Sequence, residues 1–535
     1  MKHCYALLLP ILISLIVPLH VMAENPGYAF FEDFVDVAAW FVLIAVVALL
    51  VGLAAWRDTQ RAGVFAAGMT LLLTANMLFR LPLLWLGLSA EETQRLLVQV
   101  PLHIGWTVLL AYIVTRVDNL GSIVQGTLLA VAVFLSYDAG RMILAGQAVD
   151  YRDESPLQVT LPAAGEGTAR SIATDTIRSR PDIFVIVLDG YGRQDVLREL
   201  YGVDNSEFID FLRENGFFVA DRSCANYSQT PLALFTLLGM RYVDTVRLSG
   251  MDGARIRHVF RSRLLSETVP TALRSVGYRR FVDQTWCDLF DQSVEGYEVL
   301  ASNEFPVYRN IVLRLTGKSL LDKLRRIAGQ DEVLSEGQRL RDRMLRQMGQ
   351  VHLYAAFDSP VFVFMHILSP HPPFLFGSIN SRHLDETSFS FGDGSHYKNN
   401  SGASTEEYRV EYAAQVEALT VHVRRMIARI VAAEPGAIVV LLSDHGPGSE
   451  LDFESLENTR LEERFPILHA IRVPGADSTL FYSGITPVNT FRRIFHHLFA
   501  ADSTTLPDRS YYTTWNDMFP FIDVTEAVRR EPLFK

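Results

Sequence analysis

The sequence has little cysteine and no excess of basic residues, and both features limit the kinds of protein that it can encode. Its 535 residues include 49 Lys and Arg against 60 Asp and Glu, so the net charge is −11 at pH 7. Proteins that bind nucleic acids present a basic patch or stripe, so this charge argues against a nucleic-acid partner. An anionic substrate stays compatible with it, because a bound metal ion reverses the field locally.

Only three cysteines occur in the chain. Cys4 belongs to an N-terminal apolar stretch, whereas Cys224 and Cys287 lie in the later part. Disulfides persist in oxidising compartments. If the later part is exported, Cys224 and Cys287 can form one disulfide. The alternative is a pair of unpaired buried thiols, and the sequence leaves both open.

Apolar residues are concentrated in the first third of the chain, which indicates a membrane region followed by a globular domain. Overall, 49% of residues are hydrophobic and the mean hydropathy is +0.16, both high for a soluble enzyme. Five apolar runs approach or reach the length that crosses a bilayer: residues 6–23, 37–56, 62–79, 96–114 and 123–144. We expect about five transmembrane helices over residues 1–148. The first run is either such a helix or a signal peptide, since small residues end it.

Basic residues beside the apolar runs orient this region. Arg57 and Arg61 follow the second run and Arg116 follows the fourth, and the positive-inside rule places all three in the cytoplasm. The chain beyond the fifth run is then extracytoplasmic, with a polar linker over 149–180 and a catalytic domain over 181–535. We expect a multi-pass protein of a bacterial-type inner membrane with its catalytic domain in the periplasm.

The stretch AIVVLLSDHGPG, residues 437–448, is the most informative part of the later region. Five apolar residues, 438–442, run directly into Ser443, Asp444 and His445. An uninterrupted apolar run of this length is typical of a parallel strand that is buried on both faces. Ligands of open α/β sheets bind at the carboxyl ends of such strands. A carboxylate beside an imidazole at that place indicates a divalent metal site.

Two further apolar runs end in residues of the same kinds. Residues 183–188 lead into Asp189, and residues 361–367, which contain His366, lead into a proline-rich loop that carries His371. Because the carboxyl ends of parallel strands share one edge of a sheet, these side chains can meet. We therefore expect an α/β domain with a mostly parallel central sheet.

Thr230 adds a hydroxyl to this set. It precedes Pro231 and an apolar segment, residues 232–238. Pro favours the first position of a helix and Thr is a good N-cap, so Thr230 is predicted at a helix N-terminus. Such an end attracts anions. The hydroxyl is therefore either an ordinary cap or a nucleophile that faces a phosphate or sulfate group.

Four of these stretches, IVLDGYG, NYSQT, HILSPHPPF and LLSDHG, resemble the alkaline phosphatase/sulfatase superfamily, and within it the lipoteichoic acid synthase-like membrane branch. The resemblance covers roughly residues 181–475, and the five apolar runs agree with that branch. It implies an alkaline phosphatase-like sandwich around a mostly parallel central sheet.

The resemblance also implies roles for individual residues. One divalent metal ion, whether Mn, Mg, Zn or Ca, would be held by Asp189, Thr230, Asp444 and His445. Thr230 would be the nucleophile, and His371 would contact the substrate or its leaving group. We include His366 and Arg193 as further candidate substrate contacts.

The expected reaction is transfer or hydrolysis of phosphate-type esters on lipid-linked or cell-envelope glycan substrates, through a covalent threonine intermediate. Many sulfatases convert the Cys or Ser of a C/S-x-P-x-R motif to formylglycine, whereas here Thr230 is followed directly by Pro231. Gly190 stands where those enzymes have a second acid, after Asp189. Both departures favour phosphoryl-type transfer. The alternatives are a sulfuric ester hydrolase of the same fold and a non-catalytic membrane sensor or scaffold.

Overall fold

A computed structural model describes most of the chain, which divides into two compact units. The described residues are 2–24, 31–74, 96–147, 180–243, 264–284, 336–376, 392–500, 504–516 and 521–529, together with 253, 256, 260 and 518. The first unit contains the described residues up to 147, and the second contains those from 180 onward.

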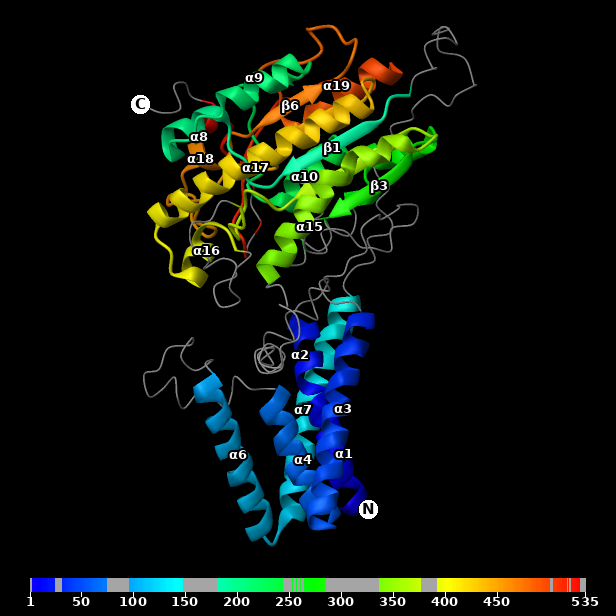
Figure 1. Cartoon of the computed structure of the whole chain (residues 1–535), viewed down its shortest axis with the longest axis vertical. Coiled ribbons are helices and arrows are strands. Elements are labelled where there is room, and N and C mark those ends of the chain that lie inside the picture. The colour runs from blue at the N-terminus through cyan, green and yellow to red at the C-terminus, as the bar shows by residue number, and fades with distance from the viewer. Residues whose placement is uncertain are drawn as a thin grey trace. The chain divides into compact units, whose positions relative to one another are not determined.

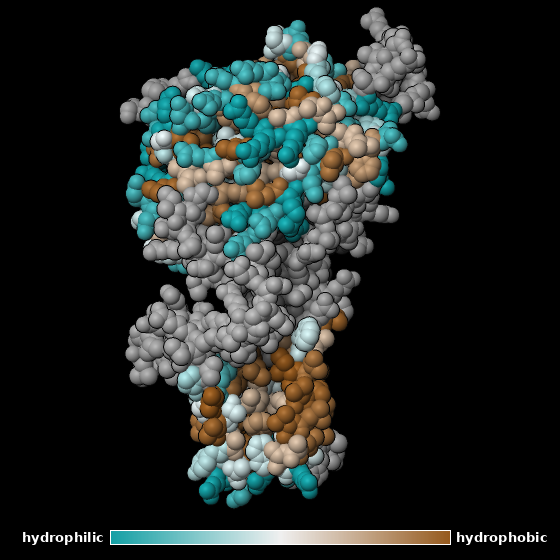
Figure 2. Space-filling model, viewed as in Figure 1, coloured by the Kyte–Doolittle hydropathy of each residue, from teal (hydrophilic) through white to brown (hydrophobic). Residues whose placement is uncertain are grey.

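The first unit is entirely helical in its described part (Figure 1). Its helices are α1 (Lys2–Ser14), α2 (Ile16–Glu24), α3 (Phe31–Trp56), α4 (Thr59–Thr74), α6 (Leu96–Arg116) and α7 (Leu120–Gln147). Helix α4 packs against α1 and α3, and α7 packs against α1 and α2. Apolar side chains cover much of the face shown in Figure 2. The carboxylate of Asp138, which is fully buried, lies 3.2 Å from Nδ1 of His20 and joins α7 to α2.

The membrane prediction is supported only in part. The described residues of all five apolar runs are mostly helical, but among them two segments are long and apolar enough to span a bilayer, Ala38–Trp56 and Leu120–Gly140. The first run is divided at Leu15 into two short helices. A bundle of five spans is therefore not confirmed, and the multi-pass topology stays a prediction.

The second unit is built on a six-stranded sheet with the order β2-β6-β5-β1-β4-β3. The strands are β1 (Ile183–Leu188), β2 (Phe218–Val219), β3 (Arg279–Gln284), β4 (Val361–Ile367), β5 (Ile438–Leu442) and β6 (His469–Arg472). Strands β3, β4, β1 and β5 are parallel to one another, whereas β6 runs antiparallel to β5 and β2 antiparallel to β6. This arrangement confirms the predicted α/β fold with a mostly parallel sheet.

Helices cover both faces of this sheet. The helices of this unit are α8 (Gln194–Tyr201), α9 (Ser206–Glu214), α10 (Thr230–Gly239), α12 (Thr268–Ser275), α15 (Glu336–Gln350), α16 (Gly394–Ser401), α17 (Thr405–Ala433), α18 (Leu461–Arg464), α19 (Pro487–Phe499) and α20 (Thr525–Val528), of which α18 and α20 pack against each other. Short 3₁₀ helices occur at Leu264–Ser266 and Val351–Ala356, and a small ribbon pairs β7 (Tyr511–Tyr512) with β8 (Ile522–Asp523).

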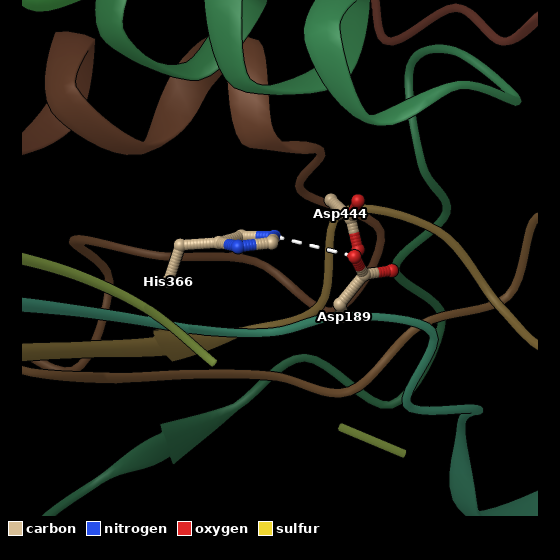
Figure 3. Close-up of side chains that lie close together, drawn as sticks. All are labelled: Asp189, His366 and Asp444. Atoms are coloured by element: carbon tan, nitrogen blue, oxygen red, sulfur yellow. Dashed lines mark ion pairs between the residues drawn. The ribbon is translucent and has the colours of Figure 1, made fainter. Parts of the chain in front are cut away.

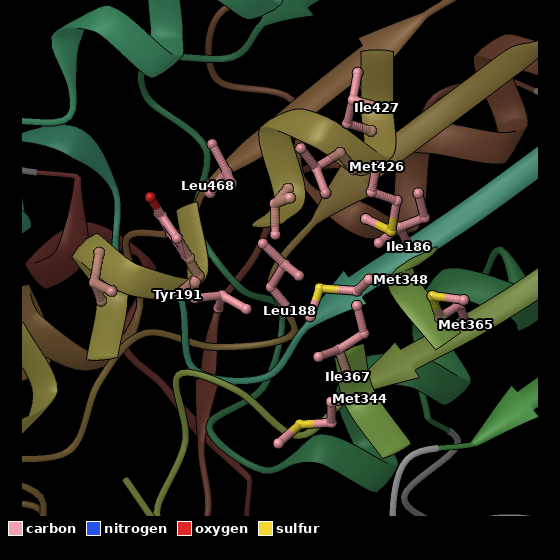
Figure 4. Close-up of a cluster of buried hydrophobic side chains, with 14 of the residues drawn as sticks. Ile186, Leu188, Tyr191, Met344, Met348, Met365, Ile367, Met426, Ile427 and Leu468 are labelled. Carbon is pink, nitrogen blue, oxygen red and sulfur yellow. The ribbon is translucent and has the colours of Figure 1, made fainter. Parts of the chain in front are cut away.

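The continuous apolar strands are explained by these two layers of helices. Along β1 the even-numbered residues from Phe184 to Leu188 pack under α8, α9, α15 and α17, as Figure 4 shows in part. The odd-numbered residues from Ile183 to Val187 pack under α10, α12 and α19. Successive side chains of a strand point to opposite faces, so a strand covered on both sides is apolar along most of its length. In β1, β4 and β5, polar side chains appear near or just beyond the carboxyl ends, where His366 is the last but one residue of β4.

Candidate active site

Three neighbouring strands bring acidic and imidazole side chains to one edge of the sheet. Strand β1 pairs with β4 on one side and β5 on the other, and Val187 is the partner of both His366 and Leu442. Asp189 follows β1 by one residue, and Asp444 follows β5 by two. The register therefore sets Asp189 and Asp444 at the same height along the strands, and His366 two residues before them on the neighbouring strand.

The two-residue period of the strands also selects the face on which these residues lie. Asp189 continues the odd positions of β1, whereas Asp444 and His366 continue the even positions of β5 and β4. All three positions belong to the face that α10 covers. One ligand atom of each lies within 4.8 Å of the others, and Nε2 of His366 is 3.4 Å from Oδ2 of Asp189 (Figure 3). The sequence predicts His366 as a substrate contact, and its position beside Asp189 makes it a candidate metal ligand as well.

His445 presents a lone pair to the same group. Its Nδ1 lies 3.0 Å from the carbonyl oxygen of Gly446, which can only accept, so Nδ1 carries the proton. Burial lowers the pKa of His445, and in the neutral ring Nε2 is unprotonated and faces Oδ1 of Asp189 at 3.4 Å and Oδ2 of Asp444 at 3.3 Å. Three electron-rich atoms that face one another repel, unless a cation lies between them.

The two carboxylates show the same need for a cation. Oδ1 of Asp189 and Oδ2 of Asp444 are buried and have no hydrogen-bond partner among the residues that the structure describes. Buried polar atoms are otherwise nearly always satisfied, and buried charges are paired or coordinate metals. A set of carboxylate oxygens and imidazole nitrogens suits a divalent transition metal, and carboxylates alone also suit Mg or Mn. The residues present therefore fit a divalent metal ion.

Thr230 lies at the open side of this group. Its Oγ1 is 3.1 Å from Nε2 of His445, and its residue is only half-buried, whereas Asp189, Asp444 and His445 are buried. Helix α10 begins at Thr230, so Gln229 rather than Thr230 occupies the N-cap position that the sequence suggests. The first N–H groups of α10 have no partner within the helix, and they favour an anion next to the hydroxyl.

His371 is held beside Asp189 by backbone contacts. Its N–H donates to the carbonyl of Asp189 at 2.8 Å, and its Nδ1 donates to the carbonyl of Pro372 at 2.6 Å. The centroids of the His371 and His445 rings are 6.3 Å apart. Because Nδ1 is engaged with Pro372, Nε2 is the nitrogen that a substrate can use.

The charges of the site shift the pKa values of its groups in opposite directions. Burial by itself raises the pKa of Asp189, but His371, His366 and His445 hold it well below its ordinary value. Burial lowers the pKa of His371, yet Asp189 and Asp393 together raise it above the usual value. For His445, burial and the guanidinium of Arg464 lower the pKa. In the metal-free protein, the site therefore favours an ionised Asp189, a neutral His445 and a proton on His371.

Two residues of the site are not predicted from the sequence, Asp393 and Arg464. Both are buried, and Nη1 of Arg464 lies 2.5 Å from Oδ2 of Asp393. Burial raises the pKa of Asp393, but Arg464 and the nearby His371 and His445 bring it to about 2. Asp393 stands in a polar segment and Arg464 in a charged one, where nothing local distinguishes a buried charge from a solvated one.

Arg193 does not join the site residues in the contacts that the structure shows. Its guanidinium binds Asp195 through Nε at 2.8 Å and Nη2 at 2.6 Å, and Nη1 donates to the carbonyl of Ser223. These contacts hold Arg193 at the start of α8, and its role as a substrate contact stays a prediction. Cys224 is a buried free thiol. The alternative of a disulfide between Cys224 and Cys287 is not tested, because Cys287 lies outside the described residues.

The family model described as Sulfatase matches residues 181–474, which is more than half of the chain. The chain therefore belongs to the sulfatase family of enzymes, within the alkaline phosphatase/sulfatase superfamily. No curated protein matches it.

Three solved structures illustrate the similarity of the chain to known proteins. A phosphonate monoester hydrolase of Agrobacterium radiobacter shares 14% identity over 63% of this chain and 80% of its own, with a TM-score of 0.38. The C-terminal periplasmic domain of EptC from Escherichia coli shares 13% identity over 64% and 93%, with a TM-score of 0.36. The corresponding domain of the phosphoethanolamine transferase EptC from Campylobacter jejuni shares 13% over 61% and 92%, with a TM-score of 0.35.

Proposed function

We propose that this protein is a membrane-anchored, metal-dependent transferase or hydrolase of phosphate-type esters that works through a covalent phosphothreonine. The observation that carries the proposal is the approach of Oγ1 of Thr230 to Nε2 of His445, at 3.1 Å, beside the carboxylates of Asp189 and Asp444. A half-buried hydroxyl at a helix N-terminus, next to a fitting metal site, has the surroundings of an activated nucleophile.

The protein's own residues would divide the reaction into two displacements. A divalent ion bound by Asp189, Asp444 and His445, with His366 adjacent, would favour the ionised hydroxyl of Thr230 and neutralise charge on the ester. The oxygen of Thr230, after losing its proton to solvent, would bond to phosphorus as the ester P–O bond breaks, and the departing oxygen would take a proton from His371. The N–H groups at the start of α10 would hold the phosphoryl oxygens. An acceptor hydroxyl or water would then give its proton to His371 and bond to phosphorus as the bond to Thr230 breaks, which restores both residues.

The nucleophile favours phosphate over sulfate esters. Thr230 cannot supply the formylglycine that sulfatases make from Cys or Ser, and Gly190 takes the place of a second acid after Asp189. We therefore propose phosphoryl transfer as the reaction, with sulfate ester hydrolysis as the alternative. An assay with a phosphate ester and a sulfate ester distinguishes the two. A non-catalytic sensor or scaffold is a weaker alternative, because a sensor would not require a metal site with an adjacent hydroxyl.

The substrate that we propose is lipid-linked or part of a cell-envelope glycan. The apolar helices α3 and α7 contain the two segments fit to span a bilayer, and anchoring would hold the second unit near lipids. We retain the division into a membrane region over 1–148, a linker over 149–180 and a catalytic domain over 181–535, with that domain in the periplasm. The assignment to the lipoteichoic acid synthase-like branch likewise remains a prediction.

The proposal is tested with the full-length chain purified in detergent. An aryl phosphodiester and the matching aryl sulfate are compared, and we expect turnover of the phosphodiester that Thr230→Ala abolishes. Thr236→Ala is the matched control, because this threonine lies on the same helix and its hydroxyl only donates to the Leu232 carbonyl. Full activity in Thr230→Ala would show that the nucleophile is another group, and turnover of the sulfate alone would favour the sulfatase alternative.

The transferred group is identified separately. After incubation with membrane lipids, mass spectrometry of the peptide that contains Thr230 should show an added mass that includes phosphate. The size of the adduct names the donor group. A peptide that stays unmodified under conditions of turnover would argue against the covalent intermediate.

A further inference from the structure

The guanidinium of Arg464 contacts the segments that carry the nucleophile and the imidazole of the site. Arg464 is one of the largest fully enclosed side chains among the described residues. Its Nε and Nη2 donate to the carbonyl of Ser228 at 3.0 and 2.9 Å. Ser228 stands two residues before Thr230, so both hydrogen bonds fix the segment that leads into the nucleophile.

The third contact of Arg464 reaches the imidazole of His445 through one carbonyl group. Nη1 of Arg464 donates to the carbonyl of Gly446 at 3.0 Å, and the same oxygen accepts the Nδ1 proton of His445 at 3.0 Å. The carbonyl that sets the tautomer and the ring orientation of His445 is thus itself held by Arg464. Partners of this kind orient the imidazoles that bind metals.

A buried carboxylate holds the guanidinium in this position. Oδ2 of Asp393 is 2.5 Å from Nη1 of Arg464, and Oδ1 of Asp393 accepts from the hydroxyl of Tyr408 at 2.6 Å. The Tyr408 hydroxyl also accepts from the N–H of Gly448, in the loop of His445. A Cβ atom at position 448 would lie 2.8 Å from the Asp393 carboxylate, so glycine permits this close approach.

We propose that Arg464 is a positioning residue that sets the distance between Thr230 and His445. Its planar fork binds the carbonyl before the nucleophile and the carbonyl beside the imidazole at the same time, and the contact with Asp393 holds the guanidinium in place. This inference rests on the proposed roles of Thr230 and His445. Arg464 does not touch the substrate, because its side chain is enclosed by these partners.

The experiment compares two conservative substitutions in the full-length protein. Arg464→Lys keeps the charge opposite Asp393 but cannot bind both carbonyls, because an ammonium lacks the fork. The matched control is Arg472→Lys. Arg472 likewise donates to backbone carbonyls, those of Asn215, Pro435 and Ala437, but these lie at the opposite end of β5 from the site.

Three quantities are measured for each variant: the melting temperature, the Kd for Mn²⁺ or Zn²⁺ by competition with a chelating dye, and kcat and KM for the aryl phosphodiester. We expect Arg464→Lys to weaken metal binding and to lower kcat by about 10- to 100-fold each, as loss of an orienting partner does, with little change in KM. Arg472→Lys should keep the metal Kd and kcat of the wild type, even where its melting temperature falls equally.

Two outcomes would overturn the inference: a wild-type metal Kd and kcat in Arg464→Lys, or equal losses in both variants that follow their melting temperatures. Should Arg464→Lys fail to fold, Asp393→Asn carries the test with the same expected direction for the metal Kd. The metal measurement also separates this inference from the proposed function. If the wild type turned over no phosphoester, the proposed function would fail, while the difference in metal Kd between the two lysine variants would still decide the role of Arg464.

Discussion

Oγ1 of Thr230 lies 3.1 Å from Nε2 of His445, although 215 residues separate them in the chain. Thr230 is placed by the N-terminus of α10, which packs on one face of the sheet, and His445 by the end of a central strand. The N-terminus of α10 thus lies next to the carboxyl end of β5. The hydroxyl therefore lies beside a group that needs a cation, and several consequences can be measured.

Removal of the metal should destabilise the protein. Asp189, Asp444 and His445 face one another with unpaired or repelling atoms, so an ion that binds only the folded state stabilises it by mass action. At a free metal concentration of 100 times Kd this amounts to about 2.7 kcal/mol. Differential scanning fluorimetry with EDTA and with added Mn²⁺ or Zn²⁺ measures the change. Asp444→Asn should lose most of the response, and an equal response in that variant would place the bound metal elsewhere.

Substitution of His371 should slow reactions according to the leaving group. Its Nδ1 is engaged with Pro372 and its ring lies near His445, so Nε2 is set to donate a proton to a departing oxygen. General acids contribute about 10²- to 10⁴-fold, and alkoxide leaving groups need them most. His371→Gln should therefore lose far more activity on an alkyl than on a nitrophenyl phosphodiester. Equal losses on both substrates would assign His371 to binding instead.

A methyl group at Gly446 should damage the loop of His445. A Cβ atom there would lie 2.2 Å from the backbone carbonyl of Glu463, which cannot move aside as a flexible side chain would. Overpacking of this kind costs about 1–3 kcal/mol, so Gly446→Ala should lower the free energy of unfolding and weaken metal binding. Gly484→Ala is the control, since a Cβ atom there meets nothing within 4 Å. Chemical denaturation of both variants gives the comparison.

His469 should make the stability of the protein fall in mild acid. Its ring is buried, and its pKa is lowered to about 4, mainly by burial. Its ordinary value in the unfolded chain is near 6.5, so between pH 6.5 and 4 the unfolded state binds the extra proton. The contribution of His469 to the free energy of unfolding is therefore fully present above pH 6.5. It is lost as the pH falls toward 4, by about 3 kcal/mol in all.

The pH dependence is measured by denaturation at a series of pH values. His469→Gln should flatten the curve over this range, whereas His497→Gln, at an exposed position of α19, should leave it unchanged. The ring of His469 contacts the hydroxyls of Ser223 and Thr490, and the glutamine can retain part of these bonds. A wild-type slope in His469→Gln would show that another group titrates.

Much of the candidate site at the edge of the sheet could be predicted from local patterns. The continuous apolar runs of β1, β4 and β5 indicated buried parallel strands, and Asp189 and Asp444 follow two of them directly. The position of His366 could also have been predicted, because the alternation of side chains along β4 puts it on the same face of the sheet as Asp189 and Asp444, the face that α10 covers. The pattern of a strand is a local property of the backbone, with a fixed period of two, so it survives in the sequence.

The sequence by itself thus determined the buried strands β1, β4 and β5 and the kinds of groups that lie at their carboxyl ends. Tertiary structure alone decided which charged residues are buried. Arg193 binds Asp195 at the start of α8. Arg464 and Asp393, which are 71 residues apart in the chain, instead pair with each other in the interior beside the site. In the sequence, an arginine that will be buried cannot be distinguished from one that will lie near the surface. The free energy of burying its charge depends on the partners that surround it after folding.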